Sequence, residues 1–303
     1  MPEEPSVSIV IPAYNEERFI GRCLESCINQ TSAPDEIIVV NNRSTDNTVS
    51  IARRYREQNP HIDIRILDQN DYQGIVPTRN HGYNNARSDI IGRTDADAIP
   101  AHNWIEAIRR RFKDPDVDAA TGPCTYDMPM RGVILSLDRM LRERHCNEKN
   151  ERFLLGLNMA IRTRAWEAVR HLTQLDLENE LHEDIDLALT LFENGFEIVF
   201  EPSMVVTTSG RRVDSSLPDF YNYVRRYPRT TELHGIKSRT ARTTVITLML
   251  LYYPSRTMRF FYDVDNSEFT SEKLREELRK RTSLLRRRNR TDELATARML
   301  TGP

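Results

Sequence analysis

The chain carries little net charge and few cysteines, and both features exclude classes of protein. Its 43 Lys and Arg and 45 Asp and Glu residues leave a formal net charge of −2 over 303 residues. Such a balance gives no general attraction to a polyanion, so we expect no nucleic-acid partner. Its four cysteines have neither paired CxxC spacing nor the density of a secreted disulfide scaffold. This predicts reduced thiols at Cys23, Cys27, Cys124 and Cys146.

Long hydrophobic runs are also missing. The start MPEEPSVSIVIP has no basic region followed by a long apolar stretch, so no signal peptide is visible and we expect a cytoplasmic protein. The apolar segment 245–254 is too short for a hydrocarbon core of about 30 Å, and we expect Pro254 to interrupt any longer helix. Basic residues flank this segment: Lys237, Arg239, Arg242, Arg256 and Arg259. The region could pack on the rest of the chain, form a dimer contact, or rest peripherally on anionic lipid at the inner face of a membrane.

Over the first hundred residues, apolar runs alternate with helical patterns. The runs expected to be strands are 7–12, 36–40, 62–67 and 89–94. The stretches expected to be helices between them are 19–28, 49–55 and 77–86. Repeated strand and helix units of this length predict an α/β fold with a mainly parallel central sheet and helices on both faces. The length favours one main domain.

Three polar loops follow these strands and should meet at one edge of the sheet. They are 13–16, 41–44 and 95–97, and ligands of such sheets bind at the carboxyl ends of the strands. In the third loop, Asp95 and Asp97 place two carboxylates one residue apart. Mg²⁺ and Mn²⁺ take oxygen ligands from one or two carboxylates and from phosphates, so this loop is a candidate metal site. An Asx turn before Pro100 is the alternative.

The later part of the chain has a different character. Residues 156–162 predict a strand that leads into a helix around Trp166. Glu183, Asp184 and Asp186 begin an amphipathic helix that ends near Gly195, and these acids could be nothing more than helix caps. A last strand is expected at 197–201, followed by a cationic loop at 209–212.

Four segments, in their order and separations, resemble glycosyltransferase family 2. They are VSIVIPAYNEE, VVNNRSTDNT, the Asp-Ala-Asp triplet and EDIDL, within roughly residues 6–205. The resemblance implies a Rossmann-like GT-A fold and inverting transfer of a sugar from a nucleoside-diphosphate sugar to a hydroxyl. The acceptor would be a sugar, a lipid-linked molecule or a small molecule, in cell-envelope polysaccharide biosynthesis. A Mg²⁺ or Mn²⁺ ion would assist the reaction.

The resemblance also assigns the donor site. Asp97 would be the direct metal ligand, and Asp95 would contact the ribose or the water shell of the metal. Tyr14 would lie against the base, with a core-facing ring as the alternative. Arg79 could contact a phosphate or could be a surface helical arginine. The full set of implied donor contacts is Pro12, Ala13, Tyr14, Glu16, Asn42, Arg79, Asp95, Ala96, Arg211 and Arg212.

The second loop departs from the family pattern. Asn41 and Asn42 stand where the family more often has two aspartates. An aspartate would accept a hydrogen bond from an N–H of the nucleotide base with a charged carboxylate. Asn42 has a neutral carbonyl for that bond and an amide donor as well. The sequence therefore does not identify the nucleotide of the donor.

For catalysis, the resemblance points to Asp184 as the general base and to Glu183 as the residue that orients the acceptor. A base must be ionised and within hydrogen-bond reach of the acceptor hydroxyl, and a helix N-terminus favours an ionised carboxylate. A third metal ligand is conceivable among His145, His182 and His234, although each could be structural. We expect Trp166 to pack in the core, and Trp104 could either pack there too or stack on a sugar.

The expected organisation is a GT-A domain at 1–235 and a basic, mainly helical extension at 236–303. The domain would have a nucleotide-binding half at about 1–100 and an acceptor half at about 101–235, and the stretch 284–299 would be a solvated helix. A processive synthase is disfavoured because the chain lacks membrane spans and a Gln-x-x-Arg-Trp signature. The alternatives are a sugar nucleotidyltransferase, for which a glycine-rich activating loop is missing, and a non-catalytic nucleotide-sugar binding module.

Overall fold

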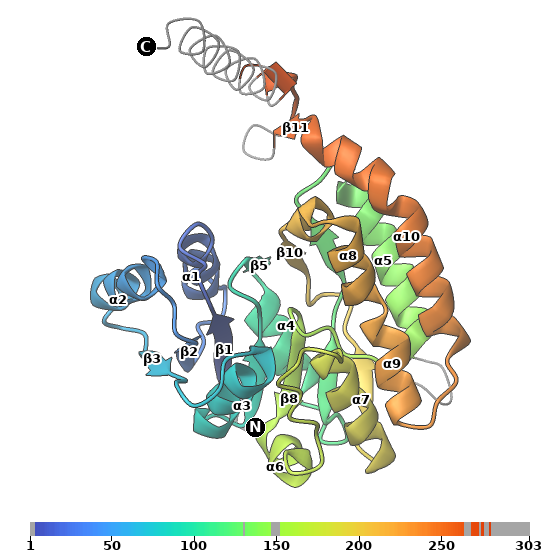
Figure 1. Ribbon diagram of the computed structural model, residues 1–303. Coiled ribbons are helices and arrows are strands. Elements are labelled where there is room, and N and C mark those ends of the chain that lie inside the picture. The colour runs from blue at the N-terminus through green and yellow to red at the C-terminus, as the bar shows by residue number, and fades with distance from the viewer. Residues whose placement is uncertain are drawn as a thin grey trace, which may run out of the picture.

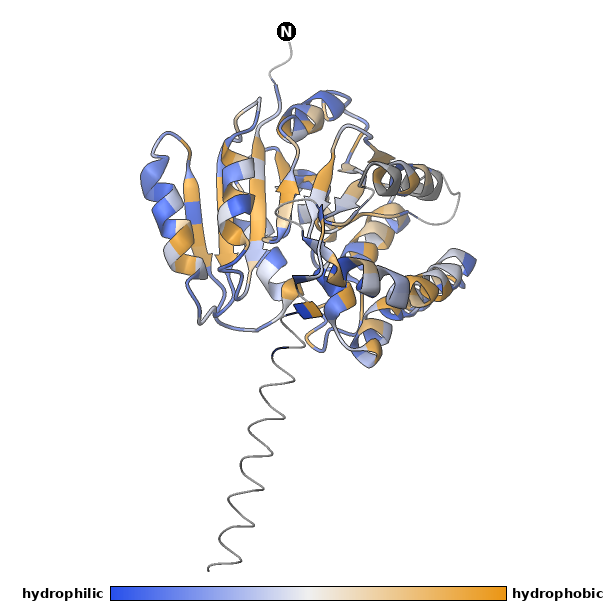
Figure 2. Ribbon diagram, turned by 90° about the horizontal axis from the view of Figure 1, so that it is seen from above, coloured by the Kyte–Doolittle hydropathy of each residue, from blue (hydrophilic) through white to orange (hydrophobic). Residues whose placement is uncertain are grey.

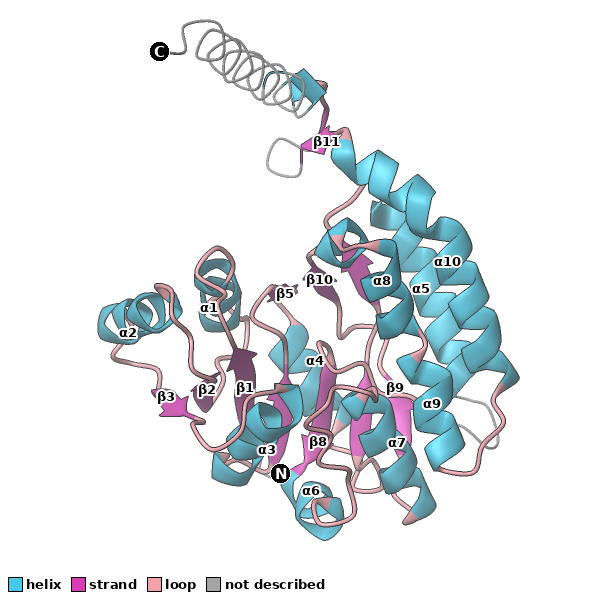
Figure 3. Ribbon diagram, viewed as in Figure 1, coloured by secondary structure: helices cyan, strands magenta, loops and turns pink. Residues whose placement is uncertain are grey.

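A seven-stranded sheet forms the centre of the molecule (Figures 1 and 3). The computed structural model describes residues 4–129, 131–146, 152–263, 268–272, 274, 275 and 279. The strand order is β3-β2-β1-β4-β8-β6-β9. The bounds are β1 Val7–Ala13, β2 Glu36–Asn41, β3 Ile64–Asp68, β4 Ile90–Arg93, β6 Ala119–Thr121, β8 Met159–Arg162 and β9 Ile198–Phe200.

Most strand pairs in this sheet are parallel, as the sequence predicted. β1 is parallel to β2 and β4, β2 to β3, and β6 to β9, whereas β8 is antiparallel to both β4 and β6. The residues of β1 and β2 are buried throughout, because helices cover both faces of a parallel sheet and select continuous apolar runs.

Helices cover the sheet in two layers. One layer is α1 Ile20–Ile28, α2 Thr48–Gln58 and α4 Trp104–Arg111, which contribute to one apolar cluster. The other is α3 Ile75–Asn85, α6 Thr163–Val169 and α7 Glu183–Glu193, which contribute to a second cluster. In the hydropathy view of Figure 2 the strands are largely apolar, while the helices carry polar residues outward. These layers confirm the predicted α/β fold.

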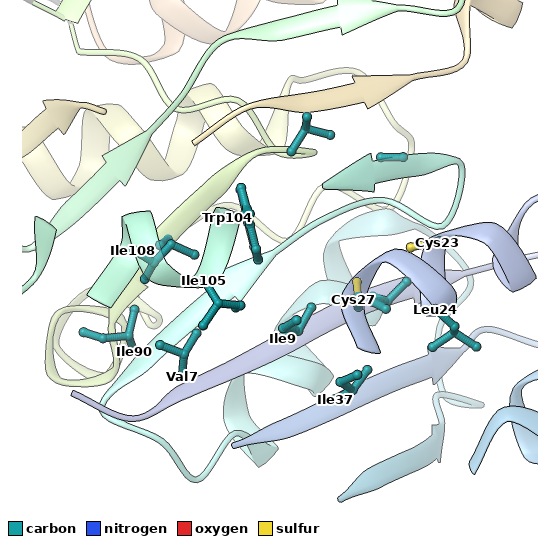
Figure 4. Close-up of a cluster of buried hydrophobic side chains, with 14 of the residues drawn as sticks. Val7, Ile9, Cys23, Leu24, Cys27, Ile37, Ile90, Trp104, Ile105 and Ile108 are labelled. Carbon is teal, nitrogen blue, oxygen red and sulfur yellow. The ribbon is translucent and has the colours of Figure 1, made fainter. Parts of the chain in front are cut away.

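Figure 4 shows the first cluster, in which side chains of α1 and α4 lie over β1 and β2. Cys23 and Cys27 of α1 are fully buried free thiols, as predicted, and Cys124 is fully buried as well. The side chain of Cys146 lies outside the described residues. Trp104 is fully buried, and its Nε1 donates to Asn158 Oδ1 at 2.8 Å. The suggested sugar-stacking role of Trp104 is therefore wrong, since its ring faces the core.

A smaller, three-stranded sheet adjoins the main one. Its order is β5-β10-β7, with β5 at Ala98–Pro100, β10 at Val206–Thr208 and β7 at Cys124–Tyr126. β5 follows Asp97 directly, and β10 leads into a short 3-10 helix, η1, at Gly210–Asp214. Because β5 and β10 are antiparallel partners, the predicted cationic loop is brought beside the acidic triplet.

In the residues that the structure describes, the C-terminal region is mainly helical, as expected. Its elements, after α5 at Arg131–Cys146, are α8 Leu217–Val224, α9 Arg226–Leu233, α10 Arg239–Phe260, β11 Tyr262–Asp263 and β12 Glu268–Phe269. α10 continues through Pro254, so the prediction that this proline would interrupt the helix is wrong. Pro254 is exposed, and it removes one backbone hydrogen bond while the neighbouring turns stay packed. In the described part of the chain, no helix has the length and apolarity needed to span a bilayer. The stretch 284–299 lies outside the described residues.

Candidate active site

The acidic triplet lies where the direction of the sheet changes. β4 runs parallel to β1 on one side and antiparallel to β8 on the other, and the triplet begins two residues after β4 ends at Arg93. A crevice at the carboxyl ends of strands, beside such a switch, is where open α/β sheets bind ligands. Arg93 is 2% exposed and its Nη2 donates to Asp95 Oδ1 at 3.1 Å. A buried guanidinium therefore holds the first carboxylate.

Arg211 joins the second carboxylate to the first polar loop. Its Nε lies 3.0 Å from Asp97 Oδ2, and its Nη1 donates to Glu16 Oε2 at 3.0 Å. The ring of Phe19 lies 4.9 Å from the guanidinium carbon. Burial, reinforced by the charge of Asp95, raises the pKa of Asp97 to about 6, although Arg211 acts in the opposite direction. The carboxylates at this edge are thus crowded and need a positive partner.

The residues at this turn fit a hard divalent cation. Asp95 and Asp97 supply carboxylate oxygens, and a cationic group of the chain already lies against Asp97. In the described part of the chain no cluster of three or more His, Cys, Asp and Glu residues could hold a metal. Most ligands would then come from diphosphate and water, as is usual for Mg²⁺. A pocket beside the turn is lined by Phe19, Asp97, Asp127 and Ser209 among others.

The second acidic pair opens α7, as predicted. Glu183 lies 2.8 Å from Arg93 Nη1, and its carbonyl accepts from Arg79 Nη1 at 2.7 Å. Burial alone would raise the pKa of Glu183, but the charges of Arg93 and Arg79 prevail and lower it to about 2. Glu183 is therefore an ionised carboxylate held by buried arginines, with a side chain 14% exposed. Arg93 thus contacts both acidic sites.

Asp184 is half-buried, and two backbone N–H groups hold its carboxylate. Its Oδ2 accepts from the backbone N–H of Gly156 at 2.8 Å, and its Oδ1 from that of Ile185 at 2.9 Å. Burial, with the adjacent charge of Glu183, raises the pKa of Asp184. His182 takes the N-cap position of α7, so Asp184 lies inside the first turn and is not its cap.

Aromatic and cationic side chains surround this pair. His182 meets the ring of Tyr223 edge-on at 4.9 Å, and the guanidinium of Arg212 lies 4.3 Å from that ring. Burial raises the pKa of Tyr223 to about 12 and lowers that of His182. The two arginines of η1 therefore diverge: Arg211 reaches the acidic triplet, while Arg212 lies on the side of Asp184.

The first polar loop offers one exposed ring. Tyr14 is 49% exposed, so the core-facing alternative is wrong. Pro12 and Ala13 are buried in β1, and the carbonyl of Ala13 accepts from the N–H of Asn42 at 2.9 Å. Ala96 is also buried. The donor contacts expected of Pro12, Ala13 and Ala96 are thus limited to their backbones.

Asn42 does not face a ligand. It is 3% exposed, its Nδ2 donates to the carbonyls of Gln69 and Tyr72 at 2.9 Å each, and its Oδ1 accepts from Gly74 N at 2.8 Å. Both amide protons are used inside the protein, so the expected readout of the base by the Asn42 amide is corrected. Asn42 holds the loop before α3 instead.

Arg79 is buried as well. It has no exposed surface, and its guanidinium carbon lies 5.8 Å from the ring of Tyr83 and 5.9 Å from that of Trp166. Neither a phosphate contact nor a surface position fits a side chain without access to solvent. The sequence showed its helical spacing, but not that α7 would cover it.

The histidines have separate surroundings. His234 lies between Asp186 and Glu193, at 3.0 Å from each. Its role is structural, because it joins the end of α9 to α7. His182 occupies the N-cap position of α7 without a capping hydrogen bond from its side chain, and the side chain of His145 lies outside the described residues.

Sequence reasoning missed Arg93, which contacts both acidic sites, and Gly156, which donates to Asp184. A cation at the end of a buried strand was a visible signal for Arg93, since such a charge needs a partner. For Gly156, the close contact depends on tertiary packing and no local signal existed.

Comparisons with known proteins agree with this geometry. Residues 8–171, more than half of the chain, match the model of the family described as Glycosyl transferase family 2. Glycosyltransferase AglE of Haloferax volcanii is 32% identical over 131 residues, which are 43% of this chain and 42% of AglE. The uncharacterized glycosyltransferase YibD of Escherichia coli K12 is 35% identical over 125 residues, 41% of this chain and 35% of YibD. The match thus spans less than half the length of these curated relatives.

Solved structures share the fold. The mannosyltransferase PcManGT from Pyrobaculum calidifontis, in complex with GDP-Man and Mn²⁺, has a TM-score of 0.59 at 19% identity, over 84% of this chain and 72% of PcManGT. TarS 1–349 of S. aureus, in complex with UDP-GlcNAc, has a TM-score of 0.56 at 18% identity, over 84% of this chain and 75% of TarS. By its sequence and its GT-A fold, this chain belongs to glycosyltransferase family 2.

Proposed function

We propose that the protein transfers a sugar from a nucleoside-diphosphate sugar to an acceptor hydroxyl, with inversion at the anomeric carbon. The observation that carries this proposal is the pair of acidic sites at one sheet edge, Asp95 with Asp97 and Glu183 with Asp184, both in contact with Arg93. Family membership supports it, and so do the nucleotide sugars bound to PcManGT and TarS. The sugar, the linkage and the acceptor would depend on the loops of the later half.

Donor binding is assigned to the triplet and η1. Asp97, helped by Asp95, would hold Mg²⁺ or Mn²⁺, and a cation bound there offsets the charge of the departing diphosphate. Arg211 now pairs with Asp97 and Glu16. When the cation binds, Arg211 would release Asp97 and turn its fork to the phosphate oxygens. Tyr14, exposed beside this edge, would cover the base.

Proton transfer is assigned to Asp184. Its raised pKa makes its carboxylate a stronger base than that of an exposed aspartate. Asp184 would take the proton of the acceptor hydroxyl as that oxygen attacks from the side opposite the diphosphate, which inverts the configuration. Glu183, fixed by two arginines, would orient Asp184 and the acceptor.

We also propose that α10 rests on anionic lipid. Ile246, Leu250 and Tyr253 are 61%, 73% and 62% exposed and recur at helical spacing on one face. α10 has four arginines and no Asp or Glu; Arg259 pairs with Asp127 and Asp214, and the positive charge of the other three complements an anionic surface. Such a contact would suit an acceptor anchored in a membrane.

The proposed transfer is tested by variants after a thermal-shift screen of nucleotide sugars with and without Mn²⁺ has identified the donor. Asp184→Asn should lower turnover by about 10³-fold, within the range of a lost general base, while donor affinity stays nearly unchanged. Asp97→Ala should remove the Mn²⁺-dependent part of donor binding. Asp116→Asn, an exposed carboxylate near the opposite edge, is the control. Full turnover by Asp184→Asn would refute the assignment of the base.

A further inference from the structure

Arg93 is a buried cation with partners on two separate segments. Its Nη2 lies 3.1 Å from Asp95 Oδ1, in the acidic triplet, and its Nη1 lies 2.8 Å from Glu183 Oε1, at the start of α7. Only 2% of its side chain is exposed. A guanidinium is costly to bury unless carboxylates compensate its charge, so its two ion pairs are tied to its position. Segments nearly ninety residues apart in the chain thereby share one cation.

Gly156 connects the same guanidinium to Asp184. A Cβ at this position would lie 2.8 Å from Arg93 Nη1 and 3.0 Å from Cζ, so only glycine lets the backbone approach so closely. The N–H of Gly156 in turn donates to Asp184 Oδ2 at 2.8 Å. The guanidinium therefore packs against the backbone segment that holds the proposed base.

The surrounding groups keep Arg93 in this place. Arg79 holds the carbonyl of Glu183 from the side of α3, so Glu183 has a buried arginine on each side. The strand that carries Arg93 lies inside the sheet, between β1 and β8. A shift of α7 relative to the triplet would break at least one of the two ion pairs.

We propose that Arg93 is a positioning residue that fixes the acidic triplet and the Glu183–Asp184 pair relative to each other. The inference rests on the proposed transfer reaction and adds a role for a side chain that itself touches no substrate. The planar fork of arginine can serve two carboxylates at once, whereas the single ammonium of lysine cannot hold both in the same geometry. A displacement of about 1 Å between reacting groups can cost about 10²-fold in rate.

The test compares Arg93→Lys with Arg65→Lys in the full chain. Arg65 forms an equally short ion pair, 2.8 Å to buried Glu36, but at the opposite edge of the sheet. Both variants are assayed well below their melting temperatures. We expect Arg93→Lys to lower kcat by about 10²-fold with a smaller change in the donor KM, and Arg65→Lys to leave kcat within about twofold of wild type. A merely structural role would lower the melting temperature of both variants without this loss of kcat.

A double-mutant cycle with Glu183→Gln supplies the second readout. If Arg93 acts through Glu183, the neutral pair Arg93→Gln with Glu183→Gln should lose no more kcat than Glu183→Gln alone. This pair also leaves no unpaired charge at Glu183, so it stays informative if Arg93→Lys fails to fold.

Wild-type kcat in Arg93→Lys, or losses that multiply in the cycle, would overturn the positioning role. The proposed function would stand in that case, because wild type still turns over. Absence of transfer by wild type with every donor in the screen would instead refute the proposed function and this role together.

Discussion

At the scale of single residues, Asn42 is the most informative departure from the family pattern. Its amide donates to two backbone carbonyls and accepts one N–H, all inside the protein. A carboxylate at this position would face two carbonyl oxygens with no proton to give. Restoring the family aspartate should therefore harm this chain.

We predict that Asn42→Asp lowers the free energy of unfolding by about 3 kcal/mol, the scale of a buried charged acceptor that loses its donors. Urea unfolding at pH 7.5 measures the change. Asn103→Asp, which adds the same charge at an exposed site, should differ from wild type by less than about 0.5 kcal/mol. Equal stability of Asn42→Asp and wild type, with tighter nucleotide binding, would restore the assignment of Asn42 to the base.

Much of the candidate site around the acidic triplet could be predicted from the sequence, because short loops after buried strands must meet at one edge. The triplet, Glu16 and Arg211 converge in this way. Exposure could not be predicted: Arg79 and Asn42 have the polarity of ligand-binding residues but are covered by α7 and by the loop before α3. Polar residue type alone does not distinguish a ligand contact from a buried hydrogen bond.

At the scale of elements, η1 is held by the end of α10. Arg259 Nη1 lies 2.7 Å from Asp127 Oδ1, and its Nε lies 2.9 Å from Asp214 Oδ2. Asp127 also accepts from the N–H of Gly210 at 2.6 Å. α10, which lies after the residues that match the family model, thus supports the segment that carries Arg211.

Arg259→Met should raise the donor KM by about tenfold, which corresponds to about 1.4 kcal/mol of binding free energy. The reason is that η1 would lose the ion pairs of Arg259 with Asp127 and Asp214. Steady-state kinetics with the screened donor measure this effect. Arg242→Met removes a more exposed arginine of the same helix, 3.5 Å from Glu232, and should leave the KM unchanged. Equal effects of the two substitutions would contradict a specific anchor.

His234 gives the α7–α9 contact a defined pH dependence. Hydrogen bonds to Asp186 and Glu193 raise its pKa above the ordinary 6.5. A raised folded-state pKa stabilises the fold below the unfolded value and ceases to do so as the pH rises through the folded value. Relative to His234→Gln, wild type should lose up to about 1 kcal/mol between pH 6 and pH 9, the scale of a partly exposed ion pair. A pH-independent difference in urea unfolding would contradict this.

Element types were also predictable to different degrees. The strand and helix units up to β4 have long, clear periodicity, whereas β5, β7 and β10 have three residues each and depend on pairing with one another. The run through Pro254 was not predictable, because packing of Ala241 and Tyr252 overrides the cost of one lost hydrogen bond.

At the scale of the whole molecule, α10 lies along one side of the structure, next to α8 and α9 (Figure 1). Its exposed apolar face should bind vesicles of anionic phospholipid at low salt, and less at high salt. Leu250→Glu should reduce sedimentation with such vesicles by about tenfold, since it replaces a buried contact by a repelled charge.

Leu177→Glu introduces the same charge at a position 43% exposed outside α10 and serves as the control. Equal sedimentation of the two variants, or binding that ignores salt, would assign the apolar face to another partner. A second copy of the chain would then be detected as a concentration-dependent dimer that Leu250→Glu dissociates.

The two acidic sites that meet at one sheet edge are proposed to have separate functions: Asp97 binds the metal and Asp184 accepts the proton. The most direct measurement is a crystal structure of the protein with Mn²⁺ and the screened donor, with manganese located by its anomalous scattering. We predict a manganese peak beside Asp97, Arg211 turned to the diphosphate, and Asp184 facing the anomeric carbon. Manganese elsewhere, with Asp184 directed away from the sugar, would contradict the account.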